Sequence, residues 1–318
     1  MVHVLGIDAG GTKTVCVLAD EQRRVLATAR GGGANLKTAG ELGVEKVLHT
    51  VIYEALAHRD VVPAAICLGI AGVDRESDNQ TMRAIMRRIA LKTPTLVVND
   101  ALVALVAGVG DSPGVVLIAG TGSIAYGRDE RNRAARAGGW GHILGDEGSG
   151  YWIGRKALSA VIRQADGRGQ TTSLTTRVLA HFGLAAPSDL APLVYDRGLP
   201  LPTVAALGAI VQQARDEGDR EAAGILQAAA DELVLAAGSV VSRLGIGQTS
   251  FTIVLAGGMF QGVPWLASKV ERDLAGLAPR ATVRRLDVEP AAGAVRLALT
   301  LASGEVRMPA YVQRESVP

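Results

Sequence analysis

The chain has 318 residues, of which 48% are hydrophobic and 20% are charged. This composition excludes a disordered chain and is sufficient for two ordinary domains or one large one. A formal net charge of +2 gives no general case for a nucleic-acid or membrane partner. Cys16 and Cys67 lie in apolar runs, which indicates buried thiols rather than zinc ligands. The first apolar segment ends at Asp8, as a strand does and a secretion signal does not. We therefore expect a soluble protein of the cytoplasm.

The first third of the chain alternates strand and helix patterns. Short β-branched runs predict strands, and apolar residues at helical spacing predict helices. The expected order is three strands (3–7, 14–19, 24–29), a helix (39–58), a strand (64–71), a helix (79–91), a strand (95–99) and a helix (101–109). This order predicts an α/β sheet with helices packed on it.

The pattern then begins again. Three more strands are expected at 114–120, 123–128 and 133–138, then a helical insertion over about 148–244. A strand (251–256), a helix (261–276), a strand (282–286) and a final helix (290–302) follow. A shift of 109 residues aligns Gly11-Thr12 with Gly120-Thr121, Asp20-Glu21 with Asp129-Glu130, Arg24 with Arg133 and Gly32 with Gly141. Matches at one fixed offset indicate a duplicated domain.

Each copy opens with a strand that runs into a glycine-rich turn carrying hydroxyl groups. The turn residues are Gly10, Gly11, Thr12, Lys13 and Thr14 in the first copy, and Gly120, Thr121, Gly122 and Ser123 in the second. Glycine permits positive φ and a close approach to a ligand, and successive N–H groups with hydroxyls suit phosphates. A single such turn is also explained as a tight hairpin, but two at matching positions favour a phosphate site. A P-loop is excluded, because its GK[ST] pattern is absent and a strand follows the turn.

Two carboxylates stand where strands of the first copy end. Asp8 lies beside the first glycine turn, and a carboxylate among phosphate-binding amides suggests Mg²⁺ held through water. A turn-stabilising role for Asp8 is the alternative. Asp100 follows the strand at 95–99, where α/β sheets place ligands, and could accept a proton from a hydroxyl nucleophile. Helix N-capping by Asn99 or Asp100 explains the same pattern equally well.

The loop at 138–150 is the most unusual stretch, with six glycines, a Trp and two acids. Carboxylates and amides around the Trp140 ring suit sugar hydroxyls, although Asp146 or Ser149 could simply start the next helix. Asn35 offers a polyol both a donor and an acceptor. Gly257 and Gly258 could let an adenine lie against the backbone, or could serve only a tight turn.

Together these motifs resemble the BadF/BadG/BcrA/BcrD-type ATPase family, and within it N-acetylglucosamine kinases, in the sugar kinase, Hsp70 and actin superfamily. The residues that carry the resemblance are GIDAGGTKT, VVND, IAGTGSIAYG, GGWGHILGDEGSGYWIG and LAGG. The resemblance implies an α/β fold of duplicated RNase H-like (actin-like ATPase) domains with a cleft between them. The expected domains are 1–108 plus 290–318, and 109–289.

The resemblance implies transfer of phosphate from ATP to the 6-hydroxyl of an amino sugar. Thr12 and Thr121 match ATP-phosphate residues, Asp8 lies near Mg²⁺, and Asp100 matches the catalytic base. The positions that match sugar-binding residues are Asn35, Gly139, Trp140, Gly141 and Asp146. Glucosamine, N-acetylmuramate and glucose kinases share these motifs, and a non-catalytic sugar sensor that uses ATP only to close is a further alternative. We expect a homodimer.

Overall fold

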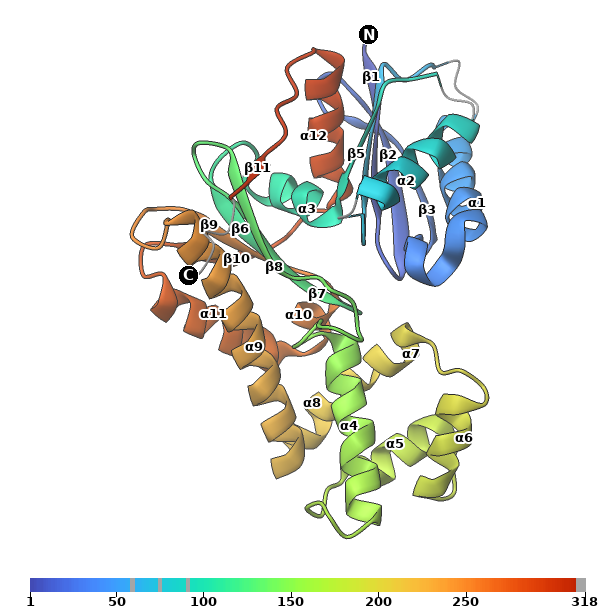
Figure 1. The fold of residues 1–318 in the computed structure, drawn as a ribbon, viewed down its shortest axis with the longest axis vertical. Coiled ribbons are helices and arrows are strands. Elements are labelled where there is room, and N and C mark those ends of the chain that lie inside the picture. Colours follow the sequence, from blue (N-terminus) through green and yellow to red (C-terminus); the bar gives the residue numbers. More distant parts are fainter. Residues whose placement is uncertain (58–60, 74–75, 90–91, 313–318) are drawn as a thin grey trace.

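The computed structural model describes residues 1–57, 61–73, 76–89 and 92–312 (Figure 1). The first sheet consists of β1 (His3–Ala9), β2 (Lys13–Asp20), β3 (Val25–Gly32), β4 (Ala65–Ile70) and β5 (Thr95–Asn99). Its helices are α1 (Leu36–Leu56), α2 (Glu76–Arg88) and α3 (Asp100–Val109). The strand order is β3-β2-β1-β4-β5, in which β2 runs antiparallel to its neighbours and β1, β4 and β5 are parallel.

The second sheet repeats this topology. Its strands are β6 (Gly114–Ala119), β7 (Ser123–Arg128), β8 (Arg133–Gly138), β9 (Thr252–Ala256), β10 (Thr282–Arg285) and β11 (Ala310–Tyr311). The order β10-β9-β6-β7-β8 matches that of the first sheet strand for strand, and β11 adds to the β8 edge. The predicted duplication is confirmed. The two-residue β11 was not predicted, because so short a segment carries no periodicity.

The β2–β3 turn of the first copy and the β7–β8 turn of the second have the same hydrogen-bond pattern. The Arg24 side chain donates to the Asp20 carboxylate at 2.7 Å, and the Arg133 side chain donates to the Asp129 carboxylate at the same distance. One predicted match is wrong. A register shift between Leu18 and Ala19 in the pairing of β2 with β3 changes the offset between the two copies from 109 to 108 residues along most of β3. Gly32 therefore does not correspond to Gly141, and it is Gly31 that has a glycine as its counterpart in the second copy. That glycine is Gly139 rather than Gly141, because the Gly139 amide donates to the Ser123 carbonyl.

The helical insertion lies between β8 and β9. It comprises α4 (Gly150–Ala165), α5 (Leu174–Phe182), a 3₁₀ turn (Pro187–Asp189), α6 (Leu190–Tyr195), α7 (Leu201–Ala205), α8 (Leu207–Asp216) and α9 (Arg220–Leu244). The second copy then continues with α10 (Gly258–Gly262) and α11 (Pro264–Leu277), and α12 (Ala291–Ala302) follows β10. These elements agree with prediction except at their ends and at the helix predicted over 261–276, which Val263 divides into α10 and α11. Residues 58, 90 and 91 of the predicted helices lie outside the described residues.

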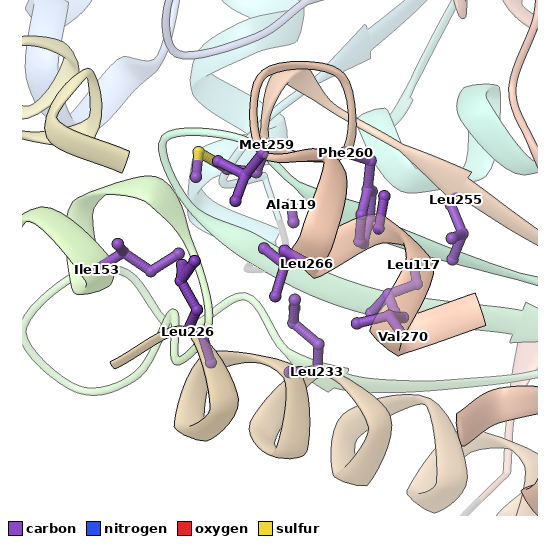
Figure 2. Close-up of a cluster of buried hydrophobic side chains, with 14 of the residues drawn as sticks. Leu117, Ala119, Ile153, Leu226, Leu233, Leu255, Met259, Phe260, Leu266 and Val270 are labelled. Atoms are coloured by element: carbon purple, nitrogen blue, oxygen red, sulfur yellow. The ribbon is translucent and has the colours of Figure 1, made fainter. Parts of the chain in front are cut away.

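Within the described part of the chain, three apolar cores hold the layers together. One joins the first sheet to α1 and α2, and includes Leu48, Ile66 and Met82. The second lies between the two sheets and is filled by α3 and α12, which pack against each other. The third joins the second sheet to the insertion and α11, and Figure 2 shows Leu226 and Leu233 of α9 within it. Helix α12 therefore packs with β1, β4 and α3, although it follows the second copy in the chain.

Helix α9 has the length and apolar composition of a membrane span. Its buried residues pack instead against α8, α11 and the second sheet. Leu226 and Leu233 face Ile153 and Leu266 in the close-up (Figure 2). The apolar character of α9 is therefore explained by its place in a protein core.

Candidate active site

The two glycine-rich turns contact each other. The hydroxyl oxygens of Thr12 and Thr121 lie 2.9 Å apart, and the two residues are separated by the repeat offset of 109. The Gly10 amide donates to the Lys13 carbonyl at 3.0 Å, and the Gly120 amide donates to the Gly122 carbonyl at 2.9 Å. These two amides close their own turns, so an anion would be bound by the remaining N–H groups and by the hydroxyls.

The glycines of these turns do not use the positive φ that glycine permits. Among the glycines that the structure describes, those with positive φ lie elsewhere. The expected role of these glycines, to let a ligand approach the backbone closely, fits some of the positions and not others. A Cβ on Gly11 or Gly120 would meet open space, whereas one on Gly122 would lie 2.7 Å from a carboxylate oxygen of Asp146. Gly11 and Gly120 thus leave room for a ligand, and Gly122 leaves room for Asp146.

Asp8 and Asp100 form an acidic pair at the carboxyl edge of the first sheet. Asp8 is on β1, next to β4 and the first glycine turn, and Asp100 begins α3 directly after β5. Burial, followed by repulsion from Asp100, raises the pKa of Asp8 from 3.8 to about 7. Lys13 acts in the opposite direction and lowers this pKa.

This acidic pair is chemically suited to a divalent cation. Among the described residues, no group of three or more His, Cys, Asp or Glu side chains could form a complete protein cage for a metal. Mg²⁺ usually takes one or two carboxylates and completes its shell with water and substrate phosphates. A buried carboxyl whose charge is opposed by a neighbouring acid has such a cation as its natural counter-ion.

The structure separates the two residues that could have capped α3. Asn99 is the N-cap, and its side-chain oxygen accepts a hydrogen bond from the Ala101 amide at 2.8 Å. Asp100 is the first helical residue. The capping explanation therefore belongs to Asn99 and not to Asp100.

The loop at 138–150 is held in a strained shape around Asp146. Gly138, Gly139, Gly141 and Gly148 all have positive φ, and Asp146 itself has a φ of 61°, which is uncommon for a residue with a side chain. The Asp146 carboxylate accepts a hydrogen bond from the Gly141 amide at 3.2 Å and another from the Ser123 amide. Backbone strain of this kind is concentrated at functional sites.

Asp146 does not start helix α4. Ser149 is the N-cap, and its hydroxyl accepts a hydrogen bond from the Trp152 amide at 3.2 Å. The Asp146 side chain is buried, and this burial raises its pKa. A cavity of about 180 Å³ adjoins the loop, and its lining combines Ser123, Gly138 and Glu147 with residues of α9. The helix-start alternative therefore applies to Ser149 only.

Trp140 and Asn35 have different surroundings. Trp140 is 55% exposed, and the Arg136 guanidinium lies 4.6 Å from the centre of its ring, so one face of the ring is covered. Asn35 is half-buried at the start of α1, where its carbonyl accepts the Ala39 amide at 2.9 Å. The Ala34 amide donates to the Gly10 carbonyl at 3.0 Å, which ties the segment before Asn35 to the first glycine turn.

The glycine pair after β9 has two different roles. Gly257 has a φ of 103°, and a Cβ there would lie 2.3 Å from the Ala119 carbonyl oxygen. The turn after β9 therefore requires Gly257, which is the tight-turn role that the sequence offered as the alternative to adenine binding. A Cβ on Gly258 would meet open space, and the contact with Ala119 puts this turn beside the strand that leads to Gly120.

The chain matches one protein family over most of its length. The BadF/BadG/BcrA/BcrD ATPase family matches residues 5–298. An N-acetylmuramic acid/N-acetylglucosamine kinase of Clostridium acetobutylicum is 35% identical, over 94% of this chain and 98% of that protein. An N-acetyl-D-glucosamine kinase of Dictyostelium discoideum is 32% identical, over 93% and 97% respectively.

The fold is also that of a solved protein. A structure from Porphyromonas gingivalis, of a protein named provisionally as an N-acetylglucosamine kinase, superimposes with a TM-score of 0.74. The match covers 96% of this chain and all of that one at 22% identity, which shows the fold alone. With the duplicated topology, it confirms an α/β fold of two RNase H-like, actin-like ATPase domains. The chain belongs to the BadF/BadG/BcrA/BcrD ATPase family.

Proposed function

We propose that this protein is an ATP-dependent kinase that phosphorylates the 6-hydroxyl of N-acetylglucosamine or a related amino sugar. The observation that carries the proposal is the acidic pair Asp8–Asp100 beside two touching glycine turns. This arrangement brings a cation site and a base of the first sheet close to phosphate-binding groups of both sheets. The names of the two curated relatives support the sugar.

Asp100 is the proposed catalytic base. It accepts the proton of the sugar 6-hydroxyl while the oxygen–phosphorus bond to the sugar forms and the bond to ADP breaks. Mg²⁺ supplies neutralisation of the triphosphate charge, and Asp8 is the residue that would hold it through water. Burial raises the pKa of Asp8 to about 7, and a divalent cation beside the carboxyl would favour its charged form.

The remaining site residues divide between the two substrates. Asp146 accepts hydrogen bonds from sugar hydroxyls, assisted by Asn35 and by the backbone and ring of 139–141. We assign the phosphates to Gly11, Thr12, Lys13, Thr121 and Gly122. The expected contributions of Gly10 and Gly120 are to the shape of the turns, in which their amides are hydrogen-bonded. The buried Thr14 and Ser123 support the turns, because their hydroxyls donate to the Gly32 and Glu147 carbonyls. Gly258 provides the flat surface for adenine, with Gly257 shaping the turn.

The proposed domains follow the packing of α12. Because α12 contacts β1, β4 and α3, we assign residues 1–108 and 290–302 to the first domain and 109–289 to the second. The expected first domain also contained residues 303–312, but β11 pairs with β8 of the second sheet, so we assign this segment to the second domain. The substrates would enter a cleft between the two domains, whose closure excludes water and suppresses ATP hydrolysis. We also propose a cytoplasmic homodimer, which gel filtration and cell fractionation test.

A coupled assay of ADP release over a panel of sugars tests this function. The panel contains N-acetylglucosamine, N-acetylmuramate, glucosamine, glucose and the galacto epimer of the best substrate. We expect an amino sugar to give the highest kcat/KM, and the epimer to be poor because it leaves buried polar groups unpaired, a loss that can reach about 10⁴-fold. ATP binding without ADP release for any sugar would favour the sensor and contradict a kinase.

A further inference from the structure

Lys13, Arg30 and Glu289 form a charged cluster next to the first glycine turn. The Lys13 ammonium lies 3.0 Å from one carboxylate oxygen of Glu289, and the Arg30 guanidinium lies 2.9 Å from the other. Each carboxylate oxygen thus has its own cation. The cluster carries a net charge of about +1 by simple counting of ionised groups at neutral pH, which suits it to an anion.

Glu289 reaches this cluster from the other end of the chain. It lies in the segment that crosses from β10 to α12, where the Leu286 amide still donates to the Leu255 carbonyl of the second sheet at 2.8 Å. Arg30 is on β3 and Lys13 begins β2, so the carboxylate joins this crossover to one hairpin of the first sheet. The sequence separation between Lys13 and Glu289 is 276 residues.

Lys13 is the member of the cluster closest to the proposed chemistry. It follows Thr12, whose hydroxyl touches that of Thr121, and its charge lowers the pKa of Asp8, which the charge of Glu289 raises. The Lys13 side chain is 60% exposed, and an exposed lysine without a partner samples many rotamers. An ammonium has three donors, so Lys13 can keep Glu289 and still donate to a phosphate oxygen.

We propose that Glu289 is a positioning residue for nucleotide binding, which holds the Lys13 ammonium beside the two glycine turns so that it meets the triphosphate. The proposal rests on the proposed function, because it takes ATP as the ligand of these turns. Glu289 itself does not contact the nucleotide. Arg30 balances the second oxygen of the carboxylate, which leaves the charge of Lys13 available to the phosphates.

A double-mutant cycle tests the proposal, with Mg²⁺-ATP binding measured by calorimetry on the full chain. Lys13→Gln removes a charge-assisted phosphate contact and should weaken binding by about 10- to 100-fold. Glu289→Gln leaves Lys13 in place but unanchored, and should weaken it by about 3- to 10-fold. The double variant should bind no worse than Lys13→Gln alone, because Glu289 acts only through Lys13.

The matched control is Arg24→Gln. Arg24 makes a comparable ion pair with Asp20 at 2.7 Å, at the far end of the same hairpin, and its loss should leave ATP affinity unchanged. For Glu289→Gln we expect a higher KM for ATP, with kcat at saturating ATP within about threefold of wild type.

Three results would overturn the proposal. If Glu289→Gln binds ATP with wild-type affinity, Glu289 only connects the crossover to the first sheet, whether or not the melting temperature changes. Additive losses in the double variant would show that Glu289 acts independently of Lys13. If the wild-type protein itself does not bind ATP, the proposed function fails first, which separates that failure from the failure of this inference.

Discussion

Asp100→Asn removes one charge from the acidic pair and leaves the shape of the side chain intact. In a kinase it removes the group that accepts the proton of the sugar hydroxyl. Since phosphoryl transfer depends mainly on positioning and charge neutralisation, loss of the base should lower kcat by about 10²- to 10⁴-fold. ATP binding should persist, because the glycine turns are untouched.

The structural cost of this substitution should be small. Asn99 is the N-cap of α3, so the capping hydrogen bond is retained, and loss of the interaction between the Asp100 charge and the helix dipole costs about 0.3–1 kcal/mol. Removing its charge also relieves repulsion that raises the pKa of the buried Asp8, and this offsets part of the loss. For a protein of this size the melting temperature should therefore change by no more than about 2–4 °C.

The assay pairs a melting curve with steady-state kinetics on the same preparation. Asn99→Ala is the matched control, because it removes the cap at a cost of about 1 kcal/mol and leaves the carboxylate of Asp100 in place. We expect the control to lose stability with kcat within about tenfold of wild type, and Asp100→Asn to show the reverse. If Asp100→Asn keeps most of its kcat, Asp100 is not the base, and Asp146 becomes the next candidate.

Three further predictions concern the phosphate, cation and sugar groups. The folded protein keeps the Asp8 proton up to about pH 7, whereas an unfolded chain loses it near pH 3.8. The stability that the protonated Asp8 carboxyl contributes is therefore fully present below pH 3.8 and is lost as the pH rises through 7. Asp8→Asn should flatten that part of a stability–pH profile, and an unchanged profile would refute the shifted pKa. Thr121→Val should raise the KM for ATP several-fold more than the KM for sugar, whereas equal losses would indicate misfolding. Gly122→Ala places a Cβ 2.7 Å from a carboxylate oxygen of Asp146, so both this variant and Asp146→Ala should have a raised KM for the sugar. A wild-type KM for the sugar in these variants would show that the Asp146 carboxylate lies outside the sugar site.

The duplication could be predicted because each copy encodes the same local chemistry. Asp20 and Asp129 accept the same hydrogen bonds from the arginines four residues later. Arg23 and Asn132, which precede those arginines, both have positive φ. Turns defined by neighbouring residues leave a signal in the sequence, and the glycine turns were located for the same reason.

Other features depend on contacts between distant parts of the chain and could not be predicted. The approach of Glu289 to Lys13 requires the crossover before α12 to return to the first sheet. The one-residue change of offset in β3 is a register shift of the folded sheet. The assignment of the cap to Asn99 rather than Asp100 depends on where α3 begins, a boundary that sequence patterns locate only within a few residues.

The central claim, phosphoryl transfer to the 6-hydroxyl of an amino sugar, is tested most directly by identifying the product. Wild-type protein is incubated with Mg²⁺-ATP and N-acetylglucosamine, and the sugar is examined by phosphorus–proton correlated NMR. The account predicts one sugar phosphate for each ADP released, with its phosphorus coupled to the methylene protons at C6. Inorganic phosphate without a sugar phosphate, or coupling at another carbon, would contradict it.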